Sequence, residues 1–130
     1  MLRLWLTLAF LWLAPASAQQ LTPATTNTIA VAGTVATATK IISGVSGRFI
    51  YITGINLVPV ATASVLFTAG TGTNCGTNTT SLTGTMVFAA GQTLKAGSGY
   101  GVILVTPVGY DVCITISTAA APGFLSYALF

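Results

Sequence analysis

The chain contains very few side chains that could catalyse a reaction. Its 130 residues include no histidine, no glutamate and a single aspartate, Asp111. Hydrolysis by paired carboxylates needs two acids, and a Ser or Cys nucleophile needs a neighbouring base. Lys40 or Lys95 could act as that base for a serine, but neither has the spacing of such a pair. We therefore predict that the protein is not an enzyme and has no catalytic residue.

The same shortage argues against a metal site and a nucleotide site. Cys75 and Cys113 are the only thiols, and a structural zinc site takes four ligands. The glycine-rich segments 70–76 and 97–101 lack the following Lys and the helix that a phosphate-binding loop requires. We therefore expect no metal and no cofactor.

The first 18 residues have the three parts of a signal peptide. Arg3 provides the positive charge, residues 4–14 form an apolar run, and residues 16–18 (Ala-Ser-Ala) match a cleavage site. The run is shorter than the ~20 residues that span a bilayer; the alternative is an uncleaved N-terminal anchor. We expect a mature chain that begins at Gln19, is secreted to the periplasm, the medium or a virion surface, and keeps no stable membrane span.

The two cysteines predict one disulfide, because an even number of cysteines in an exported chain usually pairs. Two free thiols are the alternative. Cys113 lies in an alternating segment, in which Val112 and Ile114 share one face and Cys113 lies on the other. We predict that the bond holds the glycine-rich loop at 69–80, which contains Cys75, against the outer face of this strand.

Short strand patterns, separated by turns rich in Gly and Pro, follow one another and leave no room for long helices. They predict an all-β fold of seven to eight strands, arranged as an antiparallel two-sheet sandwich of the Ig-like or jelly-roll kind. Residues 19–38 are expected to be a flexible lead-in or a weak edge strand, and 39–130 the sandwich. The expected strands are 28–39 (one or two weak ones), 48–58, 63–68, 84–89, 100–106, 112–118 and 123–130.

The segment 48–58 is the strongest strand pattern. It is apolar at both alternating sets of positions, and Gly54 interrupts it. A glycine inside a strand is typical of a β-bulge. We expect this strand at the centre of the sandwich, or with its second face covered by a partner.

The mature chain has very little charge. Lys40, Arg48, Lys95 and Asp111 give it a net charge of +2. Phosphate backbones bind clustered cations, so these scattered ones predict no nucleic-acid partner. A surface almost without charge lacks the usual protection against association. This indicates a protein that works in an assembly, or one secreted into a harsh medium.

Aromatic side chains could form a contact surface for a glycan. Tyr110 is expected in a turn beside Asp111, and Tyr100 lies between Gly99 and Gly101. These two tyrosines are the candidates for exposed contact residues. They make a small carbohydrate-binding or adhesion module the first alternative function.

Four segments resemble small proteins rich in Gly and Thr, with two cysteines and a β-sandwich fold, from bacteriophage and environmental viral sequences. The resemblance spans residues 39–130 and implies a virion accessory protein of the decoration or tail-associated type, with Cys75 and Cys113 paired. No catalytic residue is carried over. The segments are 70–77 (GTGTNCGT), 82–84 (LTG), 96–101 (AGSGYG) and 112–115 (VCIT).

These features predict an exported, non-catalytic structural or interaction protein that acts by surface contact in an extracellular or virion assembly. The expected partner is another protein or a second copy of the chain, and a glycan is the alternative. The final residue, Phe130, adds a second alternative, a small outer-membrane barrel, because many such barrels end in an aromatic residue. Eight membrane strands of about 10 residues would use almost the whole chain.

Overall fold

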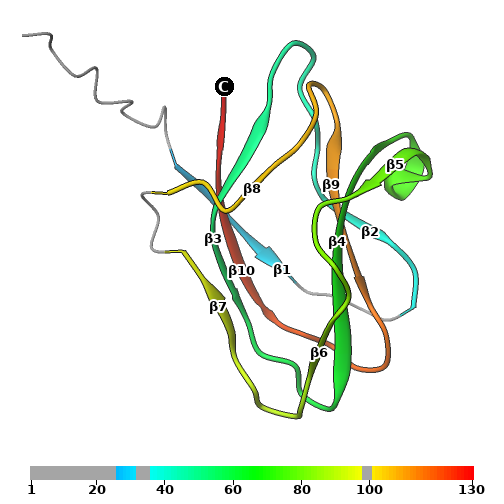
Figure 1. Cartoon of the computed structure of the whole chain (residues 1–130), viewed down its shortest axis with the longest axis vertical. Coiled ribbons are helices and arrows are strands. Elements are labelled where there is room, and N and C mark those ends of the chain that lie inside the picture. The colour runs from blue at the N-terminus through cyan, green and yellow to red at the C-terminus, as the bar shows by residue number, and fades with distance from the viewer. Residues whose placement is uncertain (1–25, 32–35, 98–100) are drawn as a thin grey trace, which may run out of the picture.

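The computed structural model describes residues 26–31, 36–97 and 101–130. The predicted signal peptide, most of the predicted lead-in and Tyr100 lie outside these residues. In the described ranges, ten strands form two antiparallel sheets of five that pack face to face (Figure 1). We name each sheet after its central long strand, as the β3 sheet and the β4 sheet.

The β3 sheet has the strand order β1-β10-β3-β7, and β8 also pairs with β3. Its strands are β1 (Asn27–Val31), β3 (Ile50–Leu57), β7 (Leu94–Ala96), β8 (Leu104–Val105) and β10 (Gly123–Leu129).

The β4 sheet has the order β2-β9-β4-β5, and β6 also pairs with β4. Its strands are β2 (Thr39–Ile42), β4 (Ala63–Thr71), β5 (Thr77–Ser81), β6 (Met86–Phe88) and β9 (Asp111–Ile116). A short 3₁₀ turn, η1 (Thr73–Cys75), lies between β4 and β5.

The order of the strands decides between the two expected sandwich types. In the immunoglobulin order A-B-E-D, the first two strands lie side by side in one sheet. Here β1 and β3 belong to one sheet and β2 and β4 to the other, so the chain crosses between the sheets after β1, after β2 and after β3. This alternation is the connectivity of a jelly roll.

Two separate sheets also correct one alternative. A closed barrel is one continuous sheet without edges, whereas the described strands form an open sandwich. The outer-membrane barrel suggested by Phe130 is therefore wrong. The last strand, β10, lies inside the β3 sheet between β1 and β3.

Apolar side chains from alternate positions of the strands fill the space between the sheets. In β9 these are Val112, Ile114 and Ile116, all buried. In β3 the alternation changes phase, because Ile52 and Ile55 both reach the core. The register explains this: Tyr127 pairs with Ile52 while Ser126 pairs with Gly54, which leaves Thr53 as an extra residue. The bulge predicted at Gly54 is thus confirmed, as is the central position of the strand.

The structure contains strands that composition did not indicate. All five residues of β5 are exposed, and their sequence TNTTS is typical of a loop. Pairing with β4 holds them in an extended conformation. Likewise, β7 lies within 90–99, which the glycines predict as a turn, and it pairs with β3. The fold class is confirmed, and these short edge strands raise the number of strands above the expected seven to eight.

Candidate functional site

The disulfide joins Cys75 in η1 to Cys113 in β9, with their Cα atoms 6.2 Å apart. Both residues are buried, yet neither belongs to the core cluster that contains their neighbours Val112 and Ile114. The turn η1 contacts β2, β4, β5 and β9, all strands of the β4 sheet. The predicted bond is therefore confirmed, and it holds the loop on the outer face of this sheet.

Other contacts fit the same loop closely to β4. A Cβ added at Gly70 would lie 2.7 Å from the Cys75 carbonyl oxygen, so only glycine allows this approach. The Thr79 hydroxyl donates to the same carbonyl. The Asn74 Oδ1 accepts from the backbone N–H of Lys40 at 3.2 Å, which ties the loop to β2. The glycine-rich segment therefore packs on the outer face of the β4 sheet, where the disulfide fixes it.

Asp111, the only acid, is engaged in structural contacts. Its Oδ1 accepts from the Gly44 N–H at 2.7 Å, and its Oδ2 lies 3.4 Å from the Lys40 Nζ. Only 14% of its side chain is exposed. These contacts hold the β2–β3 loop against the start of β9. No group of three or more His, Cys, Asp or Glu side chains that could hold a metal occurs in the part of the chain that the structure describes.

Tyr110 is half-buried and lies immediately before β9, beside Asp111. Its side chain is therefore less accessible than we expect for a residue in a turn. Tyr100 lies outside the described residues, so the structure does not bring the two predicted contact residues together.

The outer face of the β3 sheet carries a group of exposed and half-buried aromatic and aliphatic side chains. We call Phe49, Tyr51, Val105 and Phe130 the aromatic patch. The Tyr51 ring meets Phe130 edge-on at 4.9 Å between centroids and Phe49 at 6.1 Å. Phe49 and Val105 are 39% and 46% exposed. Phe130 is the C-terminal residue, and Figure 1 marks the C-terminus at one end of the sandwich.

Pairing across the sheet assembles this patch from distant parts of the chain. The backbones of Phe49 and Phe130 exchange two hydrogen bonds, of 2.7 and 3.1 Å. Tyr51 pairs with Val105 on one side and with Ala128 on the other. Because the three aromatic residues come from the start of β3 and the end of the chain, their sequence positions alone do not predict the cluster.

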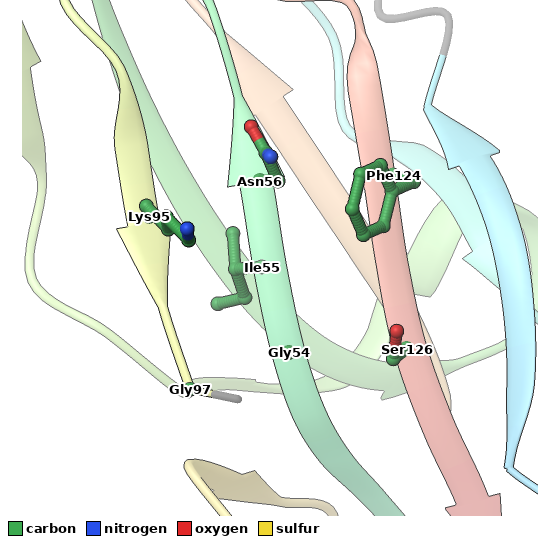
Figure 2. A pocket seen from close by; sticks show the side chains of 7 residues that line it. All are labelled: Gly54, Ile55, Asn56, Lys95, Gly97, Phe124 and Ser126. Carbon is green, nitrogen blue, oxygen red and sulfur yellow. The ribbon is translucent and has the colours of Figure 1, made fainter. Parts of the chain in front are cut away.

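A hollow of about 230 Å³ opens farther along the same face, between β7, β3 and β10. Figure 2 shows Lys95 on one side of β3 and Phe124 with Ser126 on the other. Sequence reasoning missed this site, although Gly54 within an apolar strand was a signal that a side chain is absent there. The lining residues are Gly54, Ile55, Asn56, Lys95, Gly97, Phe124 and Ser126.

Comparison of the chain with family models, with curated proteins and with solved structures finds no match. Within the described ranges, no helix has the length and apolar character to cross a bilayer.

Proposed function

We propose that the protein is an exported, non-catalytic structural protein that associates with further copies of itself in an extracellular or virion assembly. The observation that carries this proposal is the aromatic patch. In this patch Phe49 and Val105 are exposed, and the rings of Tyr51 and Phe130, which are half-buried, pack beside them. Clustered exposed apolar side chains of this kind commonly mark interaction surfaces, and aromatic residues dominate the energetics of many interfaces.

The charges of the molecule oppose association between copies only weakly. Lys40 is paired with Asp111, which leaves Arg48 and Lys95 as the other charged side chains of the described residues. Two cations per molecule give weak repulsion, because exposed charges more than about 8–10 Å apart are largely screened at physiological salt.

Two of the sheet edges, β1 and β5, support the same conclusion. Natural proteins protect edge strands with charged residues or proline. Of the strands at the ends of the two sheet orders, β2 (TKII) and β7 (LKA) each carry a lysine, whereas β1 (NTIAV) and β5 (TNTTS) contain neither. An edge strand without charge or proline does not prevent a second copy of the chain from approaching it closely.

The jelly-roll connectivity and the viral resemblance support the virion version of the proposal. Jelly rolls occur in viral capsid proteins and also in lectins. This is support by analogy, because one fold hosts many functions.

Sedimentation velocity over a range of concentrations tests the proposal. The exported, disulfide-bonded wild type is expected to form dimers or larger species as its concentration rises through the micromolar range. Phe49→Ser is expected to shift association to at least about tenfold higher concentration, the loss typical of a hot-spot side chain.

Val87→Ser is the matched control, because Val87 is 72% exposed but lies on β6 of the other sheet. It should associate as the wild type does. A wild type that stays monomeric at every concentration contradicts the proposal. Association that is weakened equally in Phe49→Ser and Val87→Ser also contradicts it.

A further inference from the structure

The register of the β3 sheet explains why the hollow between β7, β3 and β10 exists. Phe124, Asn56 and Lys95 are direct partners and form a row of three large side chains across three strands. In the next row Ser126, which has a small side chain, lies opposite Gly54, which has none. A row of large residues next to a row of small ones leaves a depression with a wall on one side.

The row of large side chains that bounds the hollow contains an aromatic ring (Phe124), a cation (Lys95) and an amide (Asn56). Phe124 is 42% exposed, so part of its side chain is open to a ligand. None of the hydrogen bonds and ion pairs found among the described residues uses the side chains of Asn56, Lys95 or Ser126. Their polar atoms are therefore available to a molecule in the hollow.

The charge of Lys95 favours an anionic ligand. The chain has one acid, Asp111, and that carboxylate is already paired with Lys40. Lys95 therefore has no acid of its own chain to neutralise it. A single lysine is too little for a polyphosphate, which binds clustered cations, but it suits one carboxylate.

We propose that this hollow binds a hexuronic acid, as a unit of an acidic polysaccharide. Lys95 binds the carboxylate, and Asn56 and Ser126 bind ring hydroxyls. The C–H groups of one sugar face pack on the Phe124 ring, whose face carries partial negative charge. The volume of about 230 Å³ lies below the 300–1,000 Å³ of pockets for drug-sized ligands, so it accepts one sugar ring. This inference does not depend on self-association.

NMR titration of the ¹⁵N-labelled, exported protein tests the proposal with glucuronate, glucose and acetate as separate probes. Glucuronate is expected to shift the signals of Gly54, Asn56 and Ser126 with a millimolar dissociation constant. Glucose is expected to bind about tenfold more weakly, because it lacks the charged hydrogen bond. Acetate is also expected to bind more weakly, because it lacks the sugar face.

Variants identify the residues responsible. Lys95→Gln should weaken glucuronate binding to the level of glucose. Phe124→Ala should weaken both sugars, and Gly54→Ala should do the same by filling the hollow; its Cβ would lie 3.4 Å from the Ser126 Cβ, which the strand tolerates. Arg48→Gln and Val87→Ala are the controls and should bind as the wild type does.

Each contrary outcome overturns the proposal. Equal binding of acetate and glucuronate would reduce the site to one for a simple anion. Equal binding of glucose and glucuronate would remove the role of Lys95. The absence of signal shifts in the folded wild type would remove the site altogether.

Discussion

Removal of the Cys75–Cys113 bond is expected to lower the free energy of unfolding by about 4 kcal/mol. The cysteines are 38 residues apart. For a closed loop of that length, the chain-entropy model gives about −13 cal/mol/K, or about 4 kcal/mol at 25 °C. We expect no large additional loss from the core, because both cysteines lie outside the core cluster and their replacement by alanine opens no cavity between the sheets.

Urea unfolding of the wild type and of the double variant Cys75→Ala, Cys113→Ala measures this difference. The midpoint should fall, and the m value should rise, since the unfolded chain without the cross-link exposes more surface. Thr115→Ala is the control: Thr115 is half-buried on the same strand and outside the core cluster, and its loss should cost less than about 1 kcal/mol. A loss below about 1 kcal/mol in the double variant would refute the reasoning.

Two further pairs of variants test the packing by urea unfolding. Gly123→Ala should lower the free energy of unfolding by about 1–3 kcal/mol, because its Cβ would overlap a backbone carbonyl of the neighbouring strand β3. A Cβ at Gly84 meets open space, so Gly84→Ala should change stability by less than about 1 kcal/mol. Thr106→Val should cost about 1–3 kcal/mol because the buried Thr106 hydroxyl accepts from the Ile50 N–H at 3.1 Å. Thr68→Val should be neutral or stabilising, since the buried Thr68 hydroxyl has no partner in the structure. Equal effects within either pair would contradict these assignments.

Local patterns in the sequence predict the features that depend on one strand or one residue. The alternation around Cys113 places the disulfide on the outer face, and Gly54 marks the bulge, because both follow from the backbone geometry of a single strand. The long strands β3, β9 and β10 are apolar enough to be recognised by composition.

Features that depend on pairing between distant strands are not visible in this way. The residues of β5 resemble a loop until β4 supplies hydrogen-bond partners. The aromatic patch needs the end of the chain beside the start of β3, and the hollow needs the register of three strands. Tyr110, which its turn position predicts to be exposed, is half-buried.

The most direct test of the proposed function is an NMR dilution series of the disulfide-bonded wild type from millimolar to low micromolar concentration. Association through the aromatic patch predicts concentration-dependent amide shifts at Phe49, Tyr51, Val105 and Phe130, with constant shifts at Val87. Shifts that are independent of concentration throughout, or that change only at residues outside the patch, would contradict the account.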